Sequence, residues 1–165
     1  MNHVRAWRGA RLLGAVCIAL QLTACSLPKV PNFIDFRNSK VAWDQVTLTA
    51  ASNANRNSPV ALDIVFITDE AVAEKIVDLP SSKWFSARAD LLKTYPKTLS
   101  YKSWELVPGQ VLNVETASLE APRVTAALIF ADYSTPGTHR VKLEDFKGRL
   151  VVRMDADDVA VSTVP

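Results

Sequence analysis

Apolar and polar residues alternate along most of the chain, and this alternation predicts a succession of β-strands. In residues 43–50, "WDQVTLTA", Val46 and Leu48 fall on one face while two threonines fall on the other, as in a half-buried strand. Residues 60–67, "VALDIVFI", are apolar on both faces except at Asp63. This is more apolar surface than a half-exposed strand requires, so we expect a central strand there.

Two helices are predicted to interrupt the strands, within residues 69–96. The first, "DEAVAEKIVDL", carries acidic residues at its start, where the helix dipole favours them, and we expect Thr68 or Asp69 to cap it. The second, "KWFSARADLLKTY", has Ser81 or Ser82 in the capping position. A proline follows each segment and ends the helix.

Strand patterns return after the helices, separated by turn residues. Pro-Gly occurs in "VPGQ" and in "STPGTH"; the first fits a type II turn, because glycine tolerates the positive φ that this turn requires. Further strands are predicted in "TLSYKSWEL", "QVLNVET", "RVTAALIFADY", "HRVKL", "RLVVRMD" and "VAVST". Together the pattern predicts a mainly β fold, a two-sheet β-sandwich of about eight strands in residues 43–165, with the two-helix insertion 69–96 between strands 2 and 3. Trp84 and Phe85 are expected to pack against the sheet.

The beginning of the chain is typical of a bacterial lipoprotein signal. Three arginines and no acid precede an apolar run at residues 12–22, which is shorter than the about 20 residues that a membrane-spanning helix needs. The run ends in "LTAC", a leucine and two small residues before Cys25, the pattern that the lipoprotein peptidase reads. We therefore expect residues 1–24 to be a removed signal peptide and Cys25 to be diacylated. Ser26 at the next position favours the outer membrane, facing the periplasm.

Processing changes the composition of the mature chain. Cys17 is lost and Cys25 is lipidated, so the domain has no disulfide and depends on burial of its core. Removing three arginines leaves 16 basic and 17 acidic residues, a net charge of −1, without a basic cluster for nucleic acid. Residues 25–42 contain two prolines and are interpreted as a lipidated tether.

The residues that could carry chemistry are few, and we expect no enzyme. The mature chain has one histidine, His139, expected to be exposed or hydrogen-bonded at the start of a strand; no nucleophile motif places Ser134 and Asp132 around it. A zinc site needs three or four ligands, and one histidine without a thiol does not supply them. The segment "DADD" at residues 155–158 fits a hairpin turn better than a calcium loop. No cofactor, metal or small-molecule substrate is therefore predicted.

A binding surface remains as the source of function. The segment "SNANRNSP", residues 52–59, is polar, flexible and rich in amides, and Arg56 within it is a possible anchor for a protein partner. The alternative is a solvated connector without a partner.

The order and spacing of these segments resemble the outer-membrane lipoprotein of type VI secretion systems, the TssJ (SciN, VasD) family. The resemblance runs from Trp43 to about Thr163, behind the lipidation signal, and rests on "WDQVTLTA", the Asn-rich loop, "VALDIVFI", the helices ending in "LLKTYP", "WELVPGQ" and "TAALIFADY". It implies a transthyretin-like sandwich with added helices. It also implies that the loop after the first strand binds the periplasmic domain of TssM, the inner-membrane subunit. The implied contact residues are Asn53, Asn55, Arg56 and Asn57.

Two functions follow as hypotheses. The first is a scaffold that attaches a secretion membrane complex to outer-membrane lipid through acylated Cys25 and binds a TssM-like subunit. The second is a free-standing periplasmic binding lipoprotein, such as a hydrolase inhibitor or a small-ligand carrier, which would have a ligand pocket and no inner-membrane partner.

Overall fold

The computed structural model describes residues 38–165. The predicted signal peptide, Cys25, Ser26 and most of the tether 25–42 lie outside the described residues. The last residues assigned to the tether belong to the folded domain, because Ser39 and Lys40 form a strand and Ala42 begins the next one. No helix within residues 38–165 is long and apolar enough to cross a membrane.

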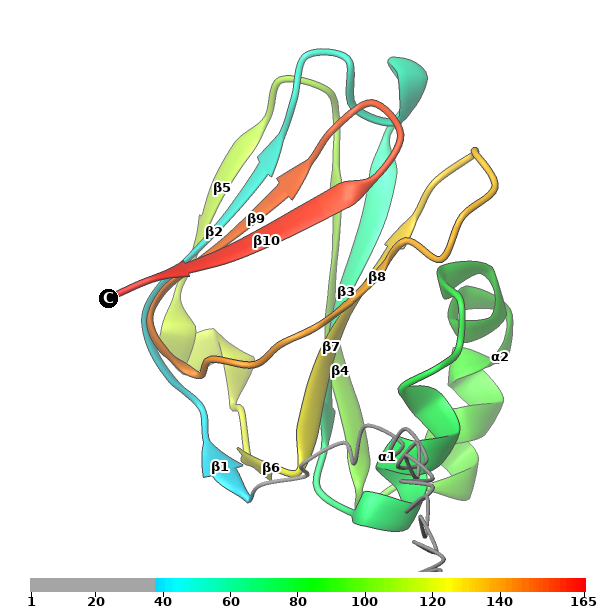
Figure 1. Cartoon of the computed structure of the whole chain (residues 1–165), viewed down its shortest axis with the longest axis vertical. Helices are drawn as coiled ribbons and strands as arrows, with labels where there is room; N and C mark the ends of the chain where they lie inside the picture. Colours follow the sequence, from blue (N-terminus) through cyan, green and yellow to red (C-terminus); the bar gives the residue numbers. More distant parts are fainter. Residues whose placement is uncertain (1–37) are drawn as a thin grey trace, which may run out of the picture. The chain divides into compact units, whose positions relative to one another are not determined.

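The described part of the chain is built mainly from β-strands, with one pair of helices (Figure 1). The strands are β1 (Ser39–Lys40), β2 (Ala42–Ala50), β3 (Val60–Ile67), β4 (Leu99–Leu106), β5 (Val111–Val114), β6 (Arg123–Val124), β7 (Ala126–Asp132), β8 (Arg140–Lys142), β9 (Lys147–Met154) and β10 (Val159–Val164). The helices are α1 (Glu70–Ile76) and α2 (Ser81–Thr94), and short 3-10 turns occur at Ala54–Arg56 and Thr116–Leu119.

Two four-stranded sheets face each other and form the predicted sandwich. Their strand orders are β10-β9-β2-β5 and β4-β3-β7-β8, and the helices connect β3 to β4, as expected. All pairs are antiparallel except β2 with β9. β1 and β6 form a separate two-residue pair, which the sequence did not predict because so short a segment shows no periodicity.

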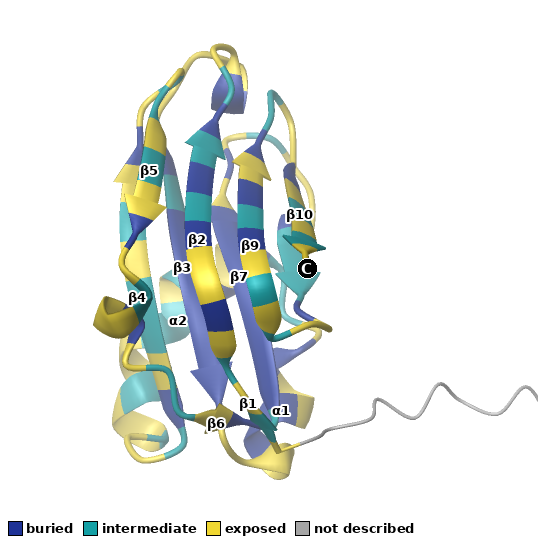
Figure 2. Ribbon diagram, turned by 90° about the vertical axis from the view of Figure 1, so that its left-hand side faces the viewer, coloured by how far each residue is buried: buried dark blue, intermediate teal, exposed yellow. Residues whose placement is uncertain are grey.

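The main core lies between the sheets and follows the predicted alternation. Val46 and Leu48 of β2 are fully buried, as are Leu62 and Ile64 of β3. Figure 2 shows alternating burial along β2 and β9 but almost continuous burial along β3 and β7. Each such side chain contributes on the order of 1.5–3 kcal/mol by leaving water, so this layer supplies much of the stability of a domain without disulfides.

The helices cover the outer face of the β4-β3-β7-β8 sheet and make a second core. Val65 and Ile67 of β3 and Phe130 of β7 are buried under Ile76 of α1 and Trp84 of α2. The rings of Trp84 and Phe130 stack with centroids 5.0 Å apart. The burial of Trp84 is confirmed, and β3 is central because both of its faces are covered.

A buried carboxylate joins α2 to the sheet. Asp63 of β3 is fully buried, and its Oδ2 accepts hydrogen bonds from Nε1 of Trp84 at 2.8 Å and from the guanidinium of Arg88 at 2.6 Å. The rings of Phe85 and Tyr101 lie close to that guanidinium, 4.8 and 5.4 Å from its carbon. Burial lowers the pKa of Arg88, but the hydrogen bond and charge of Asp63 outweigh it and raise the pKa overall.

The helix starts differ in how they are capped. Asp69 caps α1, since its carboxylate accepts a hydrogen bond from the amide of Val72 at 3.0 Å. The predicted serine cap of α2 is wrong: Pro80 precedes the helix and no side chain caps it. The hydroxyl of Ser81 instead donates to the carbonyl of His139 at 2.5 Å and accepts from the amide of Ala131, so it links α2 to β7 and to the residue before β8.

The two Pro-Gly turns also differ. Gly109 has φ +84°, and the amide of Gln110 donates to the carbonyl of Val107, which confirms the type II turn. In "STPGTH" the left-handed residue is His139, with φ 42°, and not Gly137.

Candidate interaction surface at the loop end

Three connections meet at one end of the sandwich, which we call the loop end: residues 51–59 after β2, 133–139 after β7 and 155–158 after β9 (Figure 1). The backbone amide of Asn55 donates to the carbonyl of Asp155 at 3.1 Å, and the backbone amide of Arg56 donates to the carbonyl of Ala156 at 3.2 Å. Backbone bonds between different loops make the loop end one connected surface.

The loop 51–59 has an unusual backbone. Asn55, Arg56 and Asn57 have φ values of 44°, 56° and 66°, all in the left-handed region. Asparagine tolerates this region better than most residues, which gives a conformational reason for the Asn-rich sequence. Arg56 has no such preference, so hydrogen bonds must hold it there.

The amide of Arg56 itself donates to the carbonyl of Ala156. The neighbouring Asn55 is buried, with 4% of its surface exposed. Its Oδ1 accepts from the amide and the hydroxyl of Ser134, both at 2.9 Å, and its Nδ2 donates to the carbonyl of Pro59 at 2.8 Å. Its side chain therefore fixes the shape of the loop and is not presented at the surface, which differs from the contact role implied by the resemblance. These hydrogen bonds tie the loop, which the sequence analysis describes as flexible, to Ser134.

The other three residues implied as contacts, Asn53, Arg56 and Asn57, are exposed. Nε of Arg56 lies 2.9 Å from Oδ1 of Asp157, and both side chains are well exposed, at 68% and 63%. Exposed ion pairs of this kind contribute about 0–1 kcal/mol. The guanidinium can therefore exchange Asp157 for a partner's carboxylate at little cost.

Two stacked aromatic residues, Tyr133 and His139, contact the turn 155–158 at the loop end. The hydroxyl of Tyr133 donates to the carbonyl of Asp158 at 2.7 Å and lies 3.1 Å from that of Asp155. Its ring stacks on His139 with centroids 4.7 Å apart. Burial, and then the charges of Asp158 and Asp155, raise the pKa of the Tyr133 hydroxyl. The hydroxyl therefore stays protonated and keeps donating.

His139 is buried, so of the two environments expected for it the hydrogen-bonded one is present. Its Nδ1 lies 3.0 Å from a carboxylate oxygen of Asp158, and its Nε2 lies 2.8 Å from the carbonyl of Thr135. Ser134 bonds to Asn55 instead. The structure does not bring Ser134, His139 and Asp132 into triad geometry.

An apolar flank that the sequence analysis missed lies beside the loop 51–59. Val107 and Val111, at the turn between β4 and β5, are 54% and 60% exposed. The turn is joined to the loop by the amide of Gly109, which donates to the carbonyl of Ala51 at 3.1 Å. Alternation along the edge strand β5 could have indicated an outward Val111, but only the pairing of Val111 with Thr49 brings it to the end of β2, where the loop 51–59 begins.

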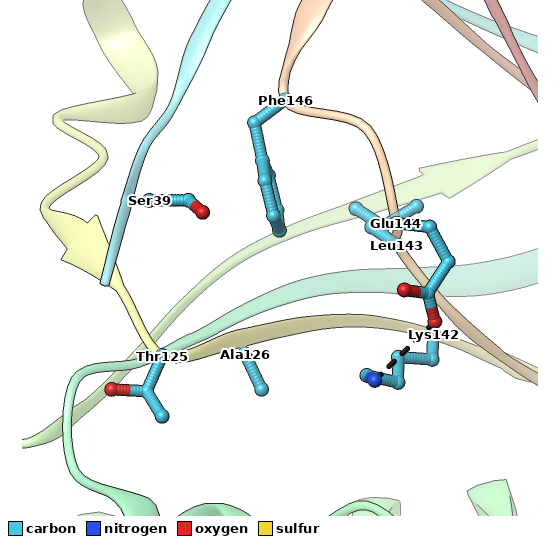
Figure 3. A pocket seen from close by; sticks show the side chains of 7 residues that line it. All are labelled: Ser39, Thr125, Ala126, Lys142, Leu143, Glu144 and Phe146. Atoms are coloured by element: carbon cyan, nitrogen blue, oxygen red, sulfur yellow. Dashed lines mark ion pairs between the residues drawn. The ribbon is translucent and has the colours of Figure 1, made fainter. Parts of the chain in front are cut away.

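Two pockets lie at the opposite end of the described domain, near β1 and β6. The first, of about 210 Å³, is shown in Figure 3. It is lined by Ser39, Thr125, Ala126, Lys142, Leu143, Glu144 and Phe146. On one side of this pocket a carboxylate oxygen of Glu144 lies 3.3 Å from Nζ of Lys142. This volume is below the roughly 300–1,000 Å³ of ordinary ligand sites. A wider groove of about 430 Å³ runs between residues 40–43 and 116–121.

Within residues 38–165 no cluster of three or more potential metal ligands occurs.

Comparisons with known proteins place the fold. No family model matches the chain, and no curated protein matches it. Among solved structures, it is similar to the type VI secretion lipoprotein TssJ1 from Pseudomonas aeruginosa, with 14% identity and a TM-score of 0.54 over 73% of this chain and 95% of that one. A chain of a type VI membrane complex matches with 14% identity and a TM-score of 0.55, over 73% and 96% of the two chains.

A third similar chain belongs to a structure described as the C-terminal domain of the type VI secretion protein TssM from EAEC. It has 13% identity and a TM-score of 0.52, over 73% of this chain and 97% of that one. The fold expected from the sequence resemblance, a two-sheet sandwich with a helical insertion like that of TssJ lipoproteins, is thereby confirmed.

Proposed function

We propose that this protein is a TssJ-like scaffold of a type VI secretion membrane complex, which binds the periplasmic domain of a TssM-like inner-membrane subunit. The single observation that carries the proposal is the likeness of its fold to a TssJ lipoprotein and to a chain of a type VI membrane complex, over nearly the whole of those chains. The sequence resemblance, reached from different features, agrees with it. The role is non-catalytic.

The anchor of the scaffold is the acylated Cys25, with Ser26 directing it to the outer membrane and the domain facing the periplasm. The lipidation motif and the short apolar run before it support this placement. Several acyl chains, at about 0.8 kcal/mol per buried methylene, make such attachment stable. Mass spectrometry of the mature protein tests it: an unmodified Cys25 contradicts the anchor.

The contact surface for the partner is the exposed part of the loop 51–59, namely Asn53, Arg56 and Asn57. Two properties support this assignment. The side chain of Asn55 ties the loop to Pro59 and Ser134, which reduces the conformational entropy that a partner must remove on binding. Arg56 is an exposed guanidinium with only a weak surface partner, and arginine is a favoured anchor in protein interfaces.

Binding between the purified full-length lipoprotein and the partner's periplasmic domain tests the function. We expect Arg56→Ala to weaken binding about tenfold or more, as for an anchor residue. Arg149→Ala is the matched control, since Arg149 is an exposed arginine on β9 away from the loop end. Normal binding by Arg56→Ala would contradict the assignment of the loop 51–59 as the contact surface. If the unaltered protein does not bind the partner, the proposed scaffold function is wrong. Cross-linking in intact cells separates the scaffold from a free-standing lipoprotein, which has no inner-membrane partner.

A further inference from the structure

The two sheets end in four edge strands within the described residues, and three of these are protected against pairing with other chains. β8 has only three residues, two of them cationic. β4 is longer but carries Lys102 and Glu105. β5 has only four residues. Short length and charge are the usual means by which proteins keep sheet edges from pairing with other strands.

β10 is the exception. Its six residues, Val159–Val164, read "VAVSTV", without a charge, a proline or a glycine, and four of the six are β-branched. Among the described residues it pairs with β9 and with no other strand. Val164 is 44% exposed. A strand of this length and composition with an open edge is a ready template for another extended segment.

The hydrogen-bond pattern shows which amides face the open edge. The amide of Asp155 donates to the carbonyl of Asp158 at 2.9 Å, so this pair closes the hairpin, and bonded and non-bonded pairs alternate along the antiparallel ladder from there. Ala160, Ser162 and Val164 therefore bond to β9. The amides of Val161 and Thr163 point away from β9, and the structure gives them no partner in residues 38–165.

The open edge begins at the loop end. The turn 155–158 that precedes β10 receives hydrogen bonds from the amides of Asn55 and Arg56. His139 contacts Asp158, the residue directly before β10, while Val161 and Thr163 lie further along the strand. A protein domain seated on Arg56 and Asp157 therefore meets the beginning of an unpaired strand.

We propose that the partner bound at the loop end adds an extended segment of its own chain to the free edge of β10, through backbone hydrogen bonds with Val161 and Thr163. The inference rests on the proposed function, because it takes the TssM-like periplasmic domain as the occupant. The segment is uncharged and rich in β-branched or apolar residues, to match the half-buried Val161 and Thr163 on one face and Ser162 and Val164 on the other.

Hydrogen exchange of the full-length lipoprotein, alone and with the partner's periplasmic domain, tests the pairing without any substitution. The amides of Val161 and Thr163 are expected to exchange about tenfold or more slowly in the complex, because each becomes hydrogen-bonded. Exchange that is unchanged in a complex that does form overturns the strand addition and leaves the proposed function standing. Absence of a complex overturns both.

Two substitutions of Thr163 give a second, independent test of the strand addition. Thr163→Pro removes the outward amide without removing a bond to β9, and is expected to weaken binding about tenfold. Thr163→Val keeps the amide and the shape of the side chain and should bind normally. Circular dichroism verifies that both variants fold. Equal binding by the two variants contradicts the proposal, as does protection of both amides by self-association without the partner, which would assign the edge to a second copy.

Discussion

Two buried polar residues organise different regions of this protein, and they do so in different ways. Asp63 is a carboxylate placed inside the apolar layer under the helices, where Trp84 and Arg88 satisfy one of its oxygens and no group in the described residues satisfies the other. Asn55 is a neutral amide at the loop end, and both its oxygen and its nitrogen are hydrogen-bonded. Burying a charge is costly unless an opposite charge lies beside it, whereas a buried neutral amide needs only hydrogen bonds.

The two clusters stabilise different parts of the domain. The Asp63 cluster fixes the helices on the sheet and leaves only part of Arg88 exposed, at 31% of its side chain. The Asn55 cluster fixes a loop whose other side chains stay in water. We expect disruption of the first to cost global stability and disruption of the second to change mainly the loop end. The predictions below test this division, in order of decreasing effect.

Trp84→Ala is expected to have the largest effect. It removes a fully buried side chain that stacks on Phe130 and donates to Asp63, and such truncations destabilise by about 3–5 kcal/mol. Urea unfolding measures the change. The matched control is Phe85→Ala, a neighbouring aromatic residue of α2 that is only partly buried and should cost clearly less. Equal losses would mean that the second core does not depend on Trp84.

Arg88→Ala should come next, at about 3 kcal/mol, because it leaves the carboxylate of Asp63 buried without its charged partner. The double variant Asp63→Asn with Arg88→Ala should recover part of the loss, since no buried charge then remains unpaired. Urea unfolding of the single and double variants gives the comparison. A double variant no more stable than Arg88→Ala would contradict the view of Asp63 as a buried charge.

Asn55→Ala is expected to cost about 1–3 kcal/mol, because it leaves the amide of Ser134 and the carbonyl of Pro59 without partners. It should also speed hydrogen exchange throughout residues 51–59, while α2 stays protected. Asn57→Ala removes an exposed amide from the same loop and serves as the control. Faster exchange spreading to α2 would show that the two regions are not separate.

Tyr133→Phe should cost about 1 kcal/mol, the usual contribution of one hydrogen bond. The raised pKa of Tyr133 adds a pH dependence with a defined sign. The unfolded chain loses the tyrosine proton near pH 10 while the folded chain retains it, so stability is complete below about pH 10 and falls as the pH rises above it. Thermal unfolding at pH 8 and above pH 10 should show a smaller decrease for Tyr133→Phe than for the unaltered protein.

Arg56→Ala should have the smallest effect on stability, under about 1 kcal/mol, because its pair with Asp157 is exposed. Thermal unfolding measures this, with Asp157→Ala as the matched variant. A large loss would mean that Arg56 holds the loop, and its effect on binding could then not be read as a lost contact.

The sequence predicted elements whose signal is local. Alternation located strands such as β2, and an apolar run on both faces located the central strand β3, because both signals lie within a few adjacent residues. The cap of α1 was predicted to be Thr68 or Asp69, and it is Asp69; Gly109 was predicted in the type II turn, because a cap and a turn are decided by a few adjacent residues. The resemblance to TssJ lipoproteins rested on the order of such segments, and the fold agrees with it. Cys25 and Ser26 remain sequence predictions.

Tertiary structure decided what depends on distant residues. Asp63 is a single polar residue in a strand pattern, and only the packing of α2 on β3 explains it. Asn55 was expected at a contact surface, but its burial depends on Ser134, which lies 79 positions away along the chain. The serine at the start of α2 was predicted to be a cap and instead bonds to His139, because a hydroxyl bonds to the nearest acceptor in space. Local patterns thus specified the strands and turns, while the loop end and the open edge of β10 were set by pairing across the chain.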